Sequence, residues 1–258
     1  MTSTRRCLTA KTAVYLALPL LGLALSGCLS GSSDSSNGTN GGSGGEPDVA
    51  FSGVYSGTST DQGGTYEIDV LAYDGVIKGL SFDAGALYEG TYPTSGNNFE
   101  GMVDAWEIGG SWFALFSLDG EIDEDSGLEA DFEPIEGAGG TGSLSVERAS
   151  DSDRNLTWTL VSGTYGYEID GHLFQFTISV DGSLEGGDSI DCSIEGEVDI
   201  PEENLNIMEL TAETTGTSCL EEGTYSGLAT LQDDADVDVF TFAASGPDSI
   251  YVDALPRR

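Results

Sequence analysis

Short runs of hydrophobic residues recur from Phe51 to the C-terminus, with Gly, Asp, Asn and Pro between them. In one such run Tyr66, Ile68 and Val70 alternate with acidic residues, so that one face is apolar and the other is charged. A period of two is typical of a β-strand with one buried face. No stretch of ten or more residues carries a helical stripe with capping residues. The pattern therefore predicts an all-β protein.

The runs predict two groups of eight strands. The first group is expected over Phe51–Thr58, Thr65–Tyr73, Val76–Phe82, Ala86–Tyr92, Asn98–Trp106, Ser111–Leu118, Leu128–Phe132 and Gly142–Glu147. The second is expected over Gly163–Glu168, His172–Val180, Ser183–Gly187, Ile190–Asp199, Leu205–Glu213, Thr224–Leu231, Asp236–Ala244 and Ser249–Ala254. The pairs Asp74-Gly75 and Asp119-Gly120 are predicted to form tight hairpin turns.

The two groups of strands align in order, which indicates a duplicated domain of about 100 residues. The matched segments are Ser52–Tyr55 with Ser162–Tyr165, Asp74–Gly79 with Asp181–Gly186, Glu89-Gly90 with Glu195-Gly196, and Ser143–Val146 with Ser249–Val252. Eight antiparallel strands must hide two sheet edges. We therefore expect two tandem antiparallel β-barrel or β-sandwich domains, over 50–148 and 155–258, with a polar junction between them.

The strongly apolar run of the chain lies upstream, over Ala13–Leu25, and basic residues precede it. This arrangement predicts a secretory signal peptide over 1–27. The run ends in Leu25-Ser26-Gly27-Cys28, which resembles the lipobox of bacterial lipoproteins. The resemblance implies that Cys28 carries a diacylglyceryl group, with acyl chains such as palmitate, and becomes the first mature residue. The membrane partner would then be reached through this anchor, because two or more acyl chains hold stably.

Residues 28–49 are rich in Gly, Ser and Asn and show no periodic apolar pattern. They predict a flexible tether with an r.m.s. reach of about 25 Å. In the lipoprotein family an aspartate after the lipidated cysteine often retains the protein at the inner membrane. Leu29 stands there instead, so the resemblance favours the outer membrane, with the body facing the periplasm or the surface.

The mature chain is strongly acidic, with 45 Asp and Glu against Lys78, Arg148, Arg154, Arg257 and Arg258. Nucleic acid is excluded as a partner, because no basic patch could displace counterions from phosphate. Three explanations of the acidity compete. Solubility in high salt, as in salt-loving bacteria, is favoured over Ca²⁺ binding, because the acids are spread along the chain. Disorder is disfavoured by the 38% hydrophobic residues in regular runs.

Cys192 and Cys219 remain after the signal peptide and the lipid anchor have taken the other two cysteines. In an exported chain such a pair predicts a disulfide. A two-cysteine metal site is the alternative, but structural zinc needs four ligands and the one histidine is His172.

The acidic run Asp119, Glu121, Asp123 and Asp125 is a weak Ca²⁺ candidate, because its alternation is correct but its sixth position is Glu instead of Gly. In a strand the same alternation gives a solvated face. We expect no metal or other cofactor beyond the lipid. No Gly-x-Ser-x-Gly elbow accompanies His172, and no carboxylate pair can be singled out, so no catalytic residue is assigned and catalysis is not expected.

The opening Gly-x-Tyr strand and the following meander resemble small barrels of the lipocalin-like class. The second half contains the Cys192…Cys219 spacing and Gly223-Thr224-Tyr225-Ser226-Gly227. With these features it also resembles uncharacterised β-rich lipoproteins of marine and salt-tolerant Gram-negative bacteria, which imply no known activity. The leading hypothesis is a lipid-anchored binding or scaffolding protein whose partner is an envelope protein or a small ligand. A barrel that carries a small apolar or cationic ligand is the alternative, and a carboxylate-dependent glycan-acting enzyme ranks last. A sizeable apolar cavity would support the carrier.

Overall fold

The computed structural model describes residues 51–258, except 93, 96, 109, 124–126, 218, 220, 235–236 and 247–248. The predicted signal peptide, Cys28 and the tether lie outside the described residues, as does Asp125. Within the described part of the chain, no helix has the length and apolar character needed to cross a lipid bilayer.

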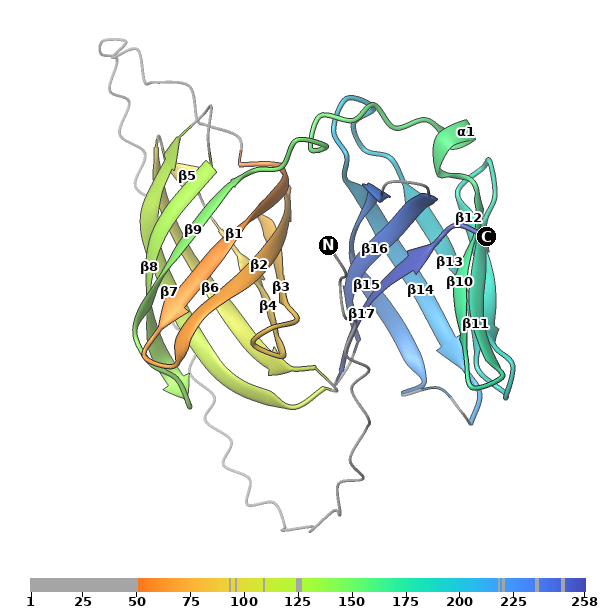
Figure 1. Ribbon diagram of the computed structural model, residues 1–258, viewed down its shortest axis with the longest axis horizontal. Coiled ribbons are helices and arrows are strands. Elements are labelled where there is room, and N and C mark those ends of the chain that lie inside the picture. The colour runs from red at the N-terminus through yellow and green to blue at the C-terminus, as the bar shows by residue number, and fades with distance from the viewer. Residues whose placement is uncertain are drawn as a thin grey trace, which may run out of the picture. The chain divides into compact units, whose positions relative to one another are not determined.

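The described residues form two all-β sheets (Figure 1). The first contains β1 (Gly53–Asp61), β2 (Gly64–Tyr73), β3 (Val76–Ser81), β4 (Ala86–Thr91), β5 (Thr94–Ser95), β6 (Asn98–Glu107), β7 (Trp112–Asp123), β8 (Gly127–Gly137) and β9 (Gly142–Arg148). After the short helix α1 (Trp158–Val161), the second contains β10 (Gly163–Ile169), β11 (His172–Ile178), β12 (Ser183–Asp188), β13 (Ser193–Asp199), β14 (Met208–Thr215), β15 (Gly223–Asp234), β16 (Val237–Ser245) and β17 (Ile250–Pro256).

Each sheet is an antiparallel meander that closes on itself. In the first barrel neighbouring strands pair in order, β4 pairs with β6, and β1 pairs with β9. In the second, β10 to β17 pair in order and a bridge joins Tyr165 of β10 to Arg257 just after β17. The prediction of two tandem antiparallel β domains is confirmed, and both are barrels. All sixteen predicted strands are present, and the short elements β5 and α1 were not predicted.

The seam of the first barrel, where its first and last strands meet, contains an arginine stacked on a tyrosine. The Arg148 guanidinium lies 5.8 Å from the centre of the Tyr55 ring and donates to the Ser52 carbonyl at 2.8 Å and to the Tyr55 hydroxyl at 3.2 Å. Gly53 has a φ of 137°, and a Cβ there would lie 2.4 Å from the Ser152 hydroxyl and 3.0 Å from the guanidinium. The glycine of the Gly-x-Tyr motif therefore makes room for the arginine.

The seam of the second barrel repeats this arrangement. Arg257 lies 5.2 Å from the centre of the Tyr165 ring, and it donates to the Ser162 carbonyl at 3.1 Å and to the Tyr165 hydroxyl at 2.8 Å. Gly163 has a φ of 155° and again faces the guanidinium. The same four residue types close both barrels, which supports the duplication that the sequence indicates.

The seams correct the last of the four sequence matches. Leu144 points into the first barrel, whereas Ile250, its predicted counterpart, packs on the outside against residues of β3 and β4. Counting back from the seam arginines, Arg148 and Arg257, the residue that corresponds to Leu144 is Asp253. The sequence match was wrong by three positions because serine and branched side chains recur on both faces of these strands.

The predicted turn at Asp119-Gly120 is also wrong, whereas Asp74-Gly75 does form the β2–β3 turn with φ values of 45° and 78°. Asp119 and Gly120 lie in the middle of β7, which continues to Asp123. A Cβ on Gly120 would come within 2.1 Å of the Glu129 carbonyl of β8. This glycine permits close approach of two strands and does not mark a turn.

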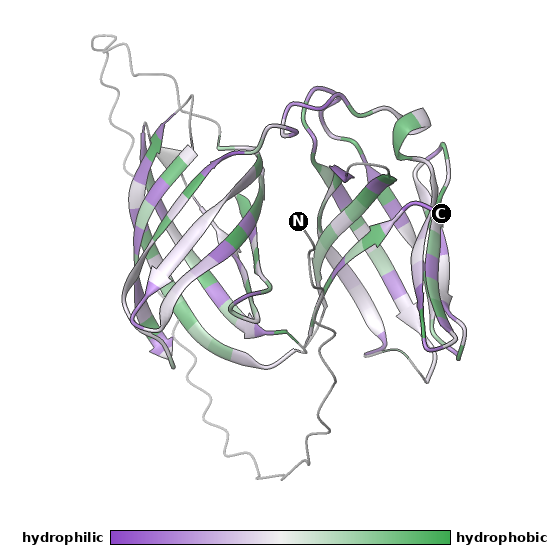
Figure 2. Ribbon diagram, viewed as in Figure 1, coloured by the Kyte–Doolittle hydropathy of each residue, from purple (hydrophilic) through white to green (hydrophobic). Residues whose placement is uncertain are grey.

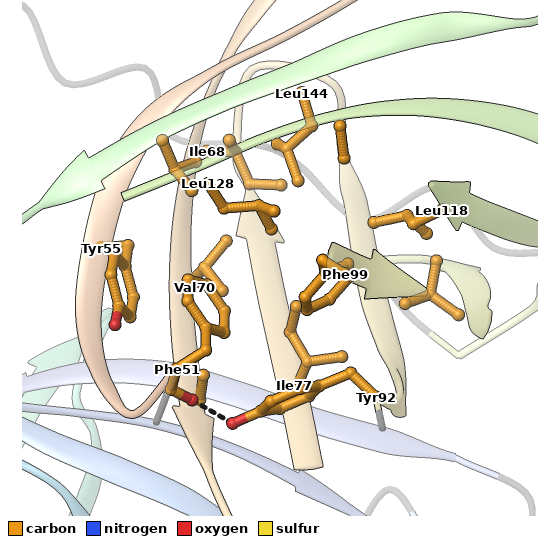
Figure 3. Packing of buried hydrophobic residues seen from close by; sticks show 14 of the residues in the cluster. Phe51, Tyr55, Ile68, Val70, Ile77, Tyr92, Phe99, Leu118, Leu128 and Leu144 are labelled. Carbon is orange, nitrogen blue, oxygen red and sulfur yellow. Dashed lines mark hydrogen bonds between the residues drawn. The ribbon is translucent and has the colours of Figure 1, made fainter. Parts of the chain in front are cut away.

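Hydrophobic and hydrophilic residues are interspersed along the strands of both barrels (Figure 2). One end of the first barrel is closed by an aromatic cluster. Phe51 stacks on Tyr55 with ring centres 4.2 Å apart and meets Phe99 edge-on at 5.5 Å. The Tyr92 hydroxyl donates to the Phe51 carbonyl (Figure 3). Aromatic packing of this kind holds the interior shut at that end.

Strand β3 is buried on both faces, which the alternating pattern does not predict. Its inward side chains join the first core, while Leu80 packs on the outside with Leu87 and Ile250. Lys78, also on the outer face, is only 4% exposed and pairs with Glu89 at 2.6 Å. It donates to Ser245 of β16 at 2.6 Å. Burial lowers the pKa of Lys78, and the Glu89 carboxylate opposes this shift.

We expect Glu89→Gln to lower the free energy of unfolding by about 3 kcal/mol, because it leaves the buried ammonium of Lys78 uncompensated. Lys78→Met removes the buried ammonium and its desolvation cost but leaves Glu89 without its cation; because Glu89 is 30% exposed and water can reach it, the loss should be smaller, about 1 kcal/mol. Urea denaturation of both variants checks this. Equal losses of unfolding free energy in the two variants would contradict the conclusion that the buried Lys78 charge depends on Glu89.

Candidate functional site

A cavity of about 200 Å³ opens into the first barrel at the end opposite the aromatic cluster. Ala84 and Gly139 line it and are exposed, so its mouth lies between the connections β1–β2, β3–β4 and β8–β9. Its lining is mostly apolar. The lining residues include Ile68, Val70, Ile77, Val103, Phe113, Phe116, Leu118, Phe132 and Leu144.

Three aromatic side chains from the last third of the barrel form one wall of the cavity. Phe116 of β7 and Phe132 of β8 meet edge-on with ring centres 5.5 Å apart, and Phe113 packs against the same core. Figure 3 shows Ile68, Leu128 and Leu144 meeting in this interior from different strands. Such a lining favours an apolar ligand, because binding would remove apolar surface of both the ligand and the lining side chains from water.

The corresponding space in the second barrel is about 40 Å³, so that interior is nearly filled. Strand register explains the difference. Val70 lies opposite Gly79 in the first barrel, and Phe176 lies opposite Gly186 in the second. One position therefore carries valine in the hollow barrel and phenylalanine in the filled one.

A second position follows the same rule. Ile68 of β2 corresponds to Phe174 of β11, two residues before the pair just described. Across the second interior, Tyr225 and Tyr251 meet edge-on at 4.8 Å. Larger rings on β11 and β17 thus occupy the volume that is open in the first barrel.

The polar groups of the cavity gather at its mouth. Asp61, at the end of β1, and Ser59 line it together with Tyr66 and Tyr88. Burial raises the pKa of the Tyr88 hydroxyl, and the Asp61 carboxylate and Tyr66 add to that shift. These groups lie on β1, β2 and β4, and β3 lies between β2 and β4 in the barrel.

The aromatic residues of the two barrels divide into four sets. Tyr66, Tyr88, Phe113 and Phe116 line the cavity. Tyr55 belongs to the closed end. Trp106 packs on the outer face, and Trp112 is 39% exposed. In the second barrel Tyr165, Phe176, Phe240 and Phe242 are core residues, and Phe174 packs against them.

The weak Ca²⁺ candidates Asp119, Glu121 and Asp123 lie on the exposed outer face of β7, alternating with inward residues. Among the described residues no group of three or more potential ligands is placed to hold a metal ion. His172 is exposed at the start of β11.

Acidic side chains also face one another across neighbouring strands. Glu195 of β13 lies directly between Glu185 of β12 and Glu213 of β14, and all three are exposed. Like charges opposite one another destabilise a sheet. Salt screens this repulsion, since the Debye length falls from about 30 Å at 0.01 M to about 3 Å at 1 M.

We expect Glu195→Gln to raise the melting temperature by about 1–3 °C at 10 mM salt and to have no effect at 1 M salt. Glu168→Gln is the matched control, because Glu168 is exposed but lies opposite Leu173. Calorimetry at the two salt concentrations measures the difference. A gain of the same size at 1 M salt would contradict charge repulsion as its cause.

Cys192 and Cys219 form a disulfide with their Cα atoms 4.8 Å apart, as predicted. It joins the β12–β13 and β14–β15 connections at one end of the second barrel. Nearby, Asp191 accepts hydrogen bonds from the Thr217 hydroxyl at 2.7 Å and from its backbone N–H at 3.2 Å. These bonds lower the pKa of Asp191.

Replacing both cysteines by serine should lower the free energy of unfolding by about 3–4 kcal/mol, because the disulfide closes a loop of 27 residues and restricts the unfolded chain. Guanidinium denaturation of the double variant, beside the oxidised and the reduced original protein, measures this. Agreement between the double variant and the reduced protein is expected, and an unchanged midpoint in both would exclude a stabilising disulfide.

Comparison of the chain with protein-family models, with curated proteins and with solved structures gave no significant match.

Proposed function

We propose that this protein is a lipid-anchored binding protein of the bacterial envelope, without catalysis, whose first barrel carries a small and largely apolar ligand. One observation carries the proposal: the cavity of about 200 Å³ in the first barrel, beside a second barrel of the same topology that is nearly filled. Side chains nearly fill the interior of the second barrel, which shows that this topology does not require a cavity, yet the first barrel has one.

The size of the cavity sets the size of the ligand. An engineered cavity of about 150 Å³ lined by Leu, Ile and Phe side chains stays dry and binds benzene. A cavity of about 200 Å³ accordingly suits one aromatic ring with a short chain. The open mouth supplies an entry path, and the apolar wall supplies the driving force through burial of the ligand's surface.

The second barrel and the anchor have supporting roles in this proposal. The predicted diacylglyceryl group on Cys28 would attach the protein to the outer membrane, and the predicted tether would let the body stand off it. The acidic exterior would keep the body soluble and away from anionic head groups.

Val70→Phe tests the binding site by copying the second barrel into the first. The phenylalanine ring should enter the cavity, because Gly79 opposite leaves the same room that Gly186 leaves beside Phe176. We expect propylbenzene to bind the original protein and to bind the variant at least about tenfold more weakly, as measured by calorimetric titration.

Phe82→Ser is the control for that titration. Phe82 is 58% exposed and does not line the cavity, so its loss should leave binding of propylbenzene unchanged. Circular dichroism and the melting temperature show whether Val70→Phe keeps its fold. If a folded Val70→Phe protein binds propylbenzene as well as the original, the ligand does not occupy the barrel.

A further inference from the structure

Among the described residues that line the cavity there is one carboxylate, and it is held in a fixed orientation. Asp61 ends β1, and its Oδ1 accepts hydrogen bonds from the backbone N–H of Gly63 at 2.7 Å and of Gly64 at 3.1 Å. Both bonds use the same oxygen. The carboxylate is half-buried at the mouth, beside the apolar interior. A group fixed by its own hairpin needs no ordering when a ligand arrives.

Two tyrosines stand beside this carboxylate. A Cβ placed on Gly63 would lie 2.7 Å from the Tyr66 hydroxyl and 3.1 Å from Oδ1 of Asp61, so the two oxygens flank one point. Tyr88 lines the same cavity from β4. Burial raises the pKa of its hydroxyl, and Asp61 and Tyr66 raise it further. Together they form a mouth with one negative charge and two phenol side chains, which is suited to a cation that can donate hydrogen bonds.

The charge around the cavity also favours a cationic ligand. Among the described residues that line it, Asp61 alone is charged, and no lysine or arginine lines it to neutralise that charge. An anion would therefore meet the Asp61 carboxylate and hydroxyl donors at the mouth, but no cationic side chain among the described lining residues. The ligand that complements this site has one positive end and one apolar end.

We propose that the cavity is selective for small monocationic amines with an apolar body. The ammonium group donates to the Asp61 carboxylate between Tyr66 and Tyr88, and the body lies against Phe113, Phe116 and Phe132. This assignment rests on the proposed function, because it names the ligand class of the same cavity.

Three probes of similar size separate the two proposals: 2-phenylethylamine, 2-phenylethanol and 3-phenylpropionate, which are cationic, neutral and anionic. Titrations are run in 1 M NaCl, where the Debye length is about 3 Å and the general attraction of an acidic protein for cations is screened. The amine should bind at least about tenfold more tightly than the alcohol, and the carboxylate should bind most weakly.

Asp61→Asn should weaken binding of the amine at least about tenfold and leave the alcohol unchanged, because asparagine Oδ1 still accepts both backbone bonds and only the charge is lost. Asp181→Asn is the matched control. Asp181 is also a turn carboxylate, exposed, bonded to Ser183 and absent from the cavity lining, so its loss should change neither affinity.

The outcomes are distinct. Equal affinities for the amine and the alcohol, or an Asp61→Asn variant that binds the amine normally, would overturn the amine assignment and leave the carrier function intact. Failure of all three probes and of propylbenzene to bind the original protein would overturn both.

Discussion

Closure of each meander into a barrel is the constraint on which the rest of the structure depends. An open eight-stranded sheet would expose two edges of unpaired backbone groups, and closure removes both. In each barrel the seam is held by a buried tyrosine, an arginine laid over its ring, and a glycine that makes room for the guanidinium. Arg148 and Arg257 are two of the five basic residues downstream of the predicted signal peptide. A chain with so few cations places two of them at the seams.

Once the backbone is closed, the content of each barrel depends on the size of a few inward side chains. Val70 and Ile68 leave space where Phe176 and Phe174 fill it, although the strands pair in the same register. Because interiors are packed to the density of crystals, these two aromatic side chains on β11, together with the Tyr251 ring on β17, account for the filled interior of the second barrel. The site is thus a property of side-chain volume within a fixed frame, and its polarity comes from the hairpin that ends at Asp61.

Much of the fold could be predicted from the sequence. Alternation works because a barrel strand has one face inside and one outside, and it located every strand longer than two residues. It failed for β3, where Lys78 and Leu80 are covered on the outer face as well. It also misread Asp119-Gly120, since a glycine can serve a close approach as well as a turn.

From the sequence, a cavity follows only from the alternative hypothesis of a ligand-carrying barrel. Tyr66, Tyr88, Phe113 and Phe116 line the cavity, but aromatic residues in a sequence do not say which rings fill an interior and which line a space. That distinction needs strand register, because Val70 becomes informative only when it is compared with Phe176. Asp61 gave no sequence signal among 45 acidic residues.

The Val70 and Phe176 pair has a consequence for how such a chain diverges after duplication. Two copies that share a frame but differ in ring size at matched positions can specialise without any change of topology. The second copy has a filled interior and a disulfide between two of its connections, whereas the first copy keeps an open interior. The volume that the first barrel encloses can therefore change through substitutions at inward positions, while the hydrogen-bonded frame of strands and seams stays as it is.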